Sequence, residues 1–123
     1  MDTEQQIKQL SDRLGLAYER QDWGIINADP ARVVEFIRFY DQGHHSDPER
    51  YALEELIFAS MNEAMVEGVA DANAHQLFDA FLRNHTKRMI PHIRYWGGLQ
   101  DAQEFPVAAT LRTFVMANQV PAE

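Results

Sequence analysis

The sequence predicts an all-α protein that folds as a single compact bundle of about five helices over residues 1–123. Apolar residues recur at spacings of three and four along most of the chain, and no segment shows the alternation of a half-buried strand. Capping and helix-breaking residues divide the chain into pieces of helical length. A chain of this size can bury a stable core without disulfides, and it contains no cysteine.

The first predicted helix covers residues 3–20, with Thr3 and Gln6 as its capping box. Gly15 weakens this helix in the middle, because glycine lowers helix stability relative to alanine. The link that follows contains Trp23 and two isoleucines. It is too apolar for a free loop, so we expect it to pack against the bundle.

Two apolar helices are predicted next. Asp29 and Pro30 suit the cap and the first turn of a second helix. Ser46 and Glu49 form a capping box for a third helix over residues 47–67. Both segments carry apolar side chains on more than one face, so we expect them to be central or to form an interface.

Asp71 or Asn73 is predicted to cap a fourth helix, which Pro91 should end or kink because proline removes a backbone donor. The "YWGG" stretch that follows is interpreted as a turn. A last helix is predicted over residues 106–118, where apolar residues again show helical spacing.

The formal charge of −8 disfavours general binding to nucleic acids or anionic membranes and favours a basic partner. No apolar run is long enough for a membrane span, and the polar start does not resemble a signal peptide. The sequence therefore predicts a soluble, cytoplasmic protein. No pattern predicts a cofactor.

The stretch "FYDQGHHSDPER" places His44 and His45 among carboxylates. The histidines could join a carboxylate such as Asp41 around a divalent ion. Adjacent residues rarely direct both rings at one ion, and the remaining residues are explained as the end of one helix and the cap of the next. We therefore interpret the stretch as a helix corner.

Two further groups of polar residues are candidates for a ligand or metal site. His85 lies on an apolar stripe and is interpreted as a core residue, although His92 would share its side if the helix continued through Pro91. In the third helix, buried carboxylates would be suited to proton transfer. We favour the alternative that the positions involved form an exposed face. These positions are Glu55, Asn62 and Glu63.

A basic and aromatic segment stands out because the chain has no carboxylate between Asp79 and Asp101. Arginine, tyrosine and tryptophan are the residues that dominate interface hot spots. The same residues could also complement a helix dipole or plug the bundle. The candidate partner-binding residues are Arg83, Lys87, Arg88, Arg94, Tyr95 and Trp96.

We therefore expect a small, acidic, helical protein-binding module without catalysis, such as an adaptor, an inhibitor or an immunity-like protein. The alternative is an enzyme that binds a metal or a small molecule with histidine and glutamate side chains of the third and fourth helices. The apolar surplus of the second and third helices also favours a homodimer.

Overall fold

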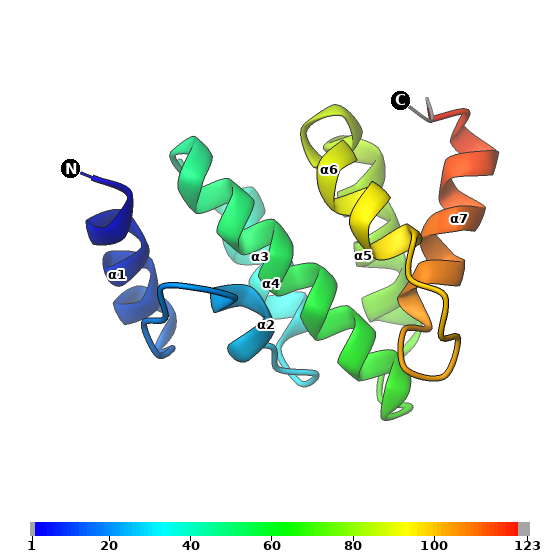
Figure 1. Cartoon of the computed structure of the whole chain (residues 1–123), viewed down its shortest axis with the longest axis horizontal. Coiled ribbons are helices and arrows are strands. Elements are labelled where there is room, and N and C mark those ends of the chain that lie inside the picture. The colour runs from blue at the N-terminus through cyan, green and yellow to red at the C-terminus, as the bar shows by residue number, and fades with distance from the viewer. Residues whose placement is uncertain (1, 121–123) are drawn as a thin grey trace.

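The computed structural model describes residues 2–120, which form helices and no strand (Figure 1). The helices are α1 (Thr3–Leu14), α2 (Trp23–Ile26), α3 (Val33–Gln42), α4 (Asp47–Val66), α5 (Ala72–Asn84), α6 (Thr86–Gly97) and α7 (Val107–Asn118). The predicted all-α class is confirmed. The described part has seven helices rather than about five, because the first link contains α2 and the predicted fourth helix is divided into α5 and α6. None of these helices is long and apolar enough to cross a membrane.

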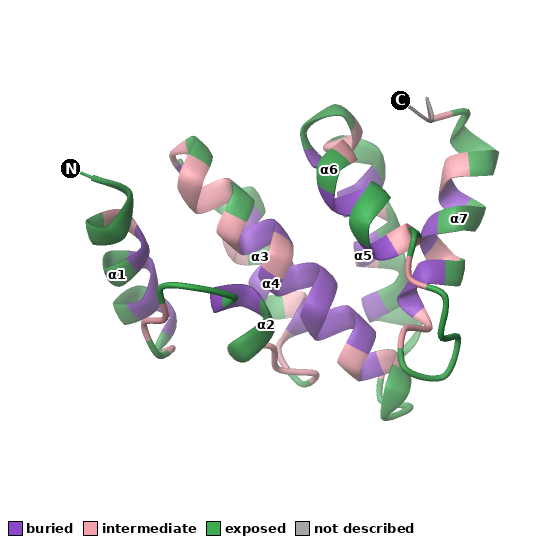
Figure 2. Cartoon of the chain, in the orientation of Figure 1, coloured by how far each residue is buried: buried purple, intermediate pink, exposed green. Residues whose placement is uncertain are grey.

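Helix α4 runs through the middle of the molecule, with α1 and α2 on one side and α6 and α7 on the other (Figure 1). It packs against α1, α2, α3, α6 and α7, and its Phe58 ring contacts Phe78 and Phe81 of α5. Half of its twenty residues are buried (Figure 2). The expectation that this helix is buried on more than one side is therefore confirmed.

Helix α1 is shorter than predicted, and its cap lies elsewhere. It ends before Gly15, which adopts a left-handed backbone with φ +69°. Glycine adopts this conformation at little cost, and so it ends the helix there instead of only weakening it. Asp2 and Gln5 form the capping box that had been assigned to Thr3 and Gln6.

The apolar link packs against the bundle, as expected. The indole Nε1 of Trp23 donates a hydrogen bond to Ser11 Oγ at 2.8 Å, and both residues are buried. The backbone of Gly24 lies directly on α4, where its N–H donates to Glu55 Oε1 at 2.9 Å. Helix α2 is therefore held to α1 through Trp23 and to α4 through Gly24.

The predicted start of the second helix at Asp29 and Pro30 is wrong. Helix α3 begins at Val33, and the Asp29 carboxylate accepts a hydrogen bond from Ala31 N. Meanwhile Asp29 N donates to Ser60 Oγ of α4. These two contacts hold Asp29 in a turn that anchors the chain to α4, instead of a helix cap.

The caps predicted for α4 and α5 are confirmed. Ser46 and Glu49 form a reciprocal capping box at the start of α4. Gly68 follows the end of α4 with φ +72°, and the Asp71 side chain accepts a hydrogen bond from Ala74 N at the start of α5. The last helix also lies where it was predicted.

The fourth predicted helix breaks at His85, not at Pro91. The hydroxyl of Thr86 donates to the carbonyl of Leu82 at 2.7 Å, and so competes with the backbone hydrogen bond that would continue the helix. Pro91 lies on the exposed side of α6, which continues through it to Gly97. The interpretation of "YWGG" as a turn is therefore wrong.

We predict that Gly24→Ala destabilises the fold by about 1–3 kcal/mol, the usual effect of overpacking. An added Cβ would lie 2.6 Å from the backbone nitrogen of Leu56, which cannot move without displacing α4. Urea unfolding would measure the change. Gly97→Ala is the matched control, because its Cβ would meet Leu111 at an ordinary 3.6 Å. Equal stability of the two variants would contradict close packing of α2 on α4.

Candidate functional site

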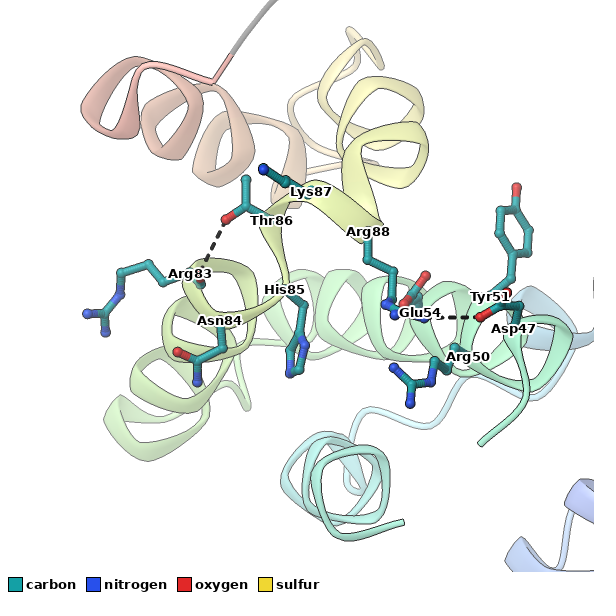
Figure 3. Close-up of a pocket in the computed structure, with 10 residues that line it drawn as sticks. All are labelled: Asp47, Arg50, Tyr51, Glu54, Arg83, Asn84, His85, Thr86, Lys87 and Arg88. Atoms are coloured by element: carbon teal, nitrogen blue, oxygen red, sulfur yellow. Dashed lines mark hydrogen bonds and ion pairs between the residues drawn. The ribbon is translucent and has the colours of Figure 1, made fainter. Parts of the chain in front are cut away.

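A pocket of about 850 Å³ lies where α4 faces the corner between α5 and α6 (Figure 3). Helix α4 contributes side chains at spacings of three and four, which place them on one face of the helix. The corner at His85 contributes the opposite wall. The lining residues are Asp47, Arg50, Tyr51, Glu54, Arg83, Asn84, His85, Thr86, Lys87 and Arg88.

Positive charge exceeds negative charge in this pocket, although the chain as a whole is acidic. Four arginine and lysine side chains face two carboxylates. Arg88 pairs with Asp47 at 3.3 Å, and Arg83 pairs with Asp79 at 2.8 Å outside the pocket. Lys87 forms no ion pair with any residue in the described range 2–120. The pocket therefore has free capacity for an anion.

Glu54 is the most deeply buried charged residue of the pocket, with 1% of its surface exposed. Its Oε2 accepts a hydrogen bond of 2.6 Å from the hydroxyl of Tyr40, which belongs to α3. Its Oε1 lies 3.5 Å from Nε2 of His92 in α6, without a hydrogen bond between them. Three helices thus meet in one polar cluster beneath the pocket.

Burial raises the pKa of Tyr40, and the hydrogen bond to Glu54 raises it further, because both favour the neutral phenol. The ring of Tyr40 also contacts Phe81 and His85 edge-on. These contacts keep the hydroxyl directed at Glu54.

The sequence prediction missed Glu54 and named its neighbour Glu55 instead. Glu54 lies on the same stripe of α4 as Phe58 and Met61, at spacings of four and seven. A carboxylate on an apolar stripe is the signal that could have found it. Glu55 faces α2, where it binds the Gly24 N–H.

The expectation that Glu55, Asn62 and Glu63 form an exposed face is wrong. Asn62 is 7% exposed, donates to the carbonyl of Glu104 and accepts from the backbone of Val107. It therefore positions the start of α7. Partial burial raises the pKa of Glu63, as do nearby carboxylates. These residues do not converge on the pocket.

His85 and His92, the candidate ligands of the fourth predicted helix, lie beside different carboxylates. His85 lines the pocket, and its Nε2 lies 3.0 Å from Asp41 Oδ1. His92 is buried beside Glu54, and the ring of Tyr51 covers it at 4.2 Å between centroids. Within residues 2–120, no three His, Asp or Glu side chains are arranged to hold a metal ion.

His44 and His45 also have different environments. His44 is exposed, whereas His45 is buried and stacks on Phe39. Nε2 of His45 lies 3.1 Å from the carbonyl of Phe39, and Arg50 Nε donates to the carbonyl of His45. The two histidines do not face a common point. His45 instead closes the corner between α3 and α4.

The predicted basic and aromatic segment does not form a single surface. Its first three cations, Arg83, Lys87 and Arg88, line the pocket. Arg94 lines an apolar groove between α6 and α7. Trp96 is 5% exposed and packs on Phe105, so the structure corrects its assignment as an accessible partner contact. Tyr95 is exposed beside it.

Comparison of the chain with protein-family models, with curated proteins and with solved structures finds no match.

We predict that Tyr40→Phe lowers the free energy of unfolding at pH 7 by about 1–3 kcal/mol, because it removes a buried donor from Glu54. The raised pKa of Tyr40 also stabilises the native state most below the ordinary tyrosine pKa, near ~10. That stabilisation begins to be lost as the pH rises past ~10 and is lost completely only above the raised pKa of the folded state, so the variant should lose less stability between pH 8 and pH 10.5.

Urea unfolding at these two pH values measures both effects. Tyr95→Phe is the control, because Tyr95 is exposed and has no contact with Glu54. An unchanged pH dependence in Tyr40→Phe would contradict the role of the buried phenol.

Proposed function

We propose that this chain is a small helical protein-binding module without catalytic activity, which holds an anionic group of its partner in the pocket between α4, α5 and α6. The observation that carries the proposal is that Arg83, Lys87 and Arg88 all line one pocket, in which Arg88 faces α4 (Figure 3). Arg83 lies before the break at His85, and Lys87 and Arg88 lie after it. The change of direction at the break places all three on the same wall of the pocket.

The charge distribution also supports a partner of mixed charge. The pocket suits an acidic side chain or a similar anion, whereas the acidic remainder of the chain suits basic residues around that anion. A basic protein that presents one acidic group meets both requirements. General binding of nucleic acid is disfavoured, because a few cations on so acidic a chain give only a local contact. An adaptor, an inhibitor or an immunity-like role fits this arrangement, as does a cytoplasmic location.

A small-molecule enzyme is the second candidate function, and the cluster of Glu54 and His92 is what favours it. Carboxylates and imidazoles that are buried beside a pocket are suited to proton transfer. A third residue that could take part in proton transfer, His85, lies on the wall of the same pocket. The two functions differ in their requirement for His92, which an enzyme would need for turnover.

Self-association stays a prediction. The apolar residues of α3 and α4 that favoured it are largely buried within the chain. Its remaining support is the exposed apolar surface of α2, which includes Ile25 and Ile26.

We predict that the double variant Arg83→Ala, Lys87→Ala reduces partner capture from the native cell lysate by about tenfold or more at low salt, since it removes two cations from the pocket. High salt should weaken capture by the unchanged protein. Quantitative affinity capture at two salt concentrations measures both effects.

The matched control is Arg20→Ala, Arg38→Ala, which removes two exposed arginines outside the pocket. Equal loss in both double variants would show that only total charge matters. If the unchanged protein captures nothing, the binding-module proposal fails, and turnover assays on His92→Gln become decisive for the second candidate.

A further inference from the structure

A second concave site lies between α6 and α7 and shares no lining residue with the pocket at α4. The two helices pack side by side and run in opposite directions (Figure 1). The groove between them has a volume of about 390 Å³, which is within the range of small-molecule sites. Its apolar lining residues are Ile90, Ile93, Leu111, Val115, Met116 and Val120.

Positive charge borders one end of this groove. Arg94 and Arg112 are the only charged side chains among its described lining residues. Nη1 of Arg112 donates to the carbonyls of Gly97 and Leu99 at 3.0 and 3.2 Å, which places this guanidinium at the C-terminal end of α6. Arg94 lies within one turn of the same end.

Both arginines keep the capacity to bind an anion. Arg112 uses Nη1 alone, so its Nε and Nη2 have no partner among residues 2–120. The side chain of Arg94 is exposed and forms no hydrogen bond or ion pair within that range. All nineteen Asp and Glu residues lie outside α6 and α7. The groove therefore attracts negative charge, although the formal charge of the chain is −8.

The rest of the groove is apolar. Because α6 and α7 are antiparallel, Ile90 lies toward the same end as Met116 and Val120, away from the C-terminal end of α6. Ile93 and Leu111 form a buried floor, with 3% and 0% of their surfaces exposed. Met116 is 81% exposed, and its flexible, unbranched side chain can close over a bound alkyl chain.

This arrangement decides between possible occupants. A second copy of the chain, docked through the same groove, would place arginine against arginine across a two-fold contact. A small hydrophilic anion would leave the apolar floor exposed. A molecule with an anionic head and an apolar chain matches both ends of the groove. The rise of α6 from Ile90 to Gly97 is about 10 Å, which suits a medium-length alkyl chain.

We propose that the groove binds a free carboxylic acid with a single, medium-length alkyl chain. The carboxylate lies at Arg94 and Arg112, and the chain extends over Ile93 and Leu111 toward Ile90. This site uses residues other than those of the pocket at α4, and so it does not depend on the binding-module proposal.

The test compares decanoate with butyrate and with decyltrimethylammonium, each below its micelle-forming concentration and at one pH and salt concentration. Titration of methyl-labelled protein, followed by the NMR signals of Ile90, Val115 and Met116, gives each affinity. We expect decanoate to bind at least about tenfold more tightly than butyrate, because each additional buried methylene group favours binding. We expect it to bind about fivefold more tightly than decyltrimethylammonium, which the arginines repel.

Arg94→Glu should weaken the binding of decanoate about fivefold and strengthen that of decyltrimethylammonium. Its side chain has no contact that the fold requires. Arg38→Glu is the matched control, because it changes the net charge equally at an exposed position of α3. Equal weakening in both variants would contradict a local role of Arg94.

Absence of decanoate binding would overturn the inference. Equal affinity for butyrate would show that the alkyl chain contributes nothing, and equal affinity for decyltrimethylammonium would show the same of the arginines. Either result would therefore overturn it too. Comparable shifts at Ile25 and Ile26, which are exposed on α2 outside the groove, would replace a specific site with general adsorption.

Discussion

The burial of α4 against neighbours on several sides is the constraint on which the rest of the structure depends. A helix that is buried on more than one face leaves few positions where polar side chains can reach water, so each one needs a partner within the fold. Ser60 binds the turn at Asp29, and Asn62 binds the start of α7. Glu55 binds α2. The polar residues of α4 therefore determine where the surrounding segments attach, while its apolar residues provide the core.

The same constraint explains where the pocket lies. The first turns of α4 carry intermediate and exposed residues, and their side chains can face solvent (Figure 2). The corner at His85 approaches this end and brings residues of α5 and α6 opposite Arg50 and Glu54. The cations of the corner are consecutive or nearly so in the sequence. The break at His85 therefore places the basic residues of this short stretch of sequence along one wall of a pocket.

The sequence predicted the elements that depend on local rules. The capping box at Ser46 and the cap at Asp71 are confirmed because capping uses residues that lie three apart in the chain. The break at His85 was missed, because a single threonine hydroxyl is a weaker signal than the proline at position 91.

The candidate site was harder to predict, because it depends on contacts between distant segments. Arg83, Lys87 and Arg88 were found from their charge, whereas Trp96 was placed with them by its type alone and is in fact buried. Glu54 was overlooked because its partners, Tyr40 and His92, lie 14 residues before it and on another helix after it. No local pattern in the chain indicates that these three side chains meet.

The stability of the fold does not by itself account for a buried carboxylate at Glu54. A buried carboxylate loses hydration, and here a single hydrogen bond from Tyr40 offsets that loss. A glutamine at this position would keep the oxygen acceptor for Tyr40 without the charge. A leucine at 54 with a phenylalanine at 40 would extend the apolar stripe of Phe58 and Met61. A carboxylate is therefore not the only side chain that this position of the fold could hold.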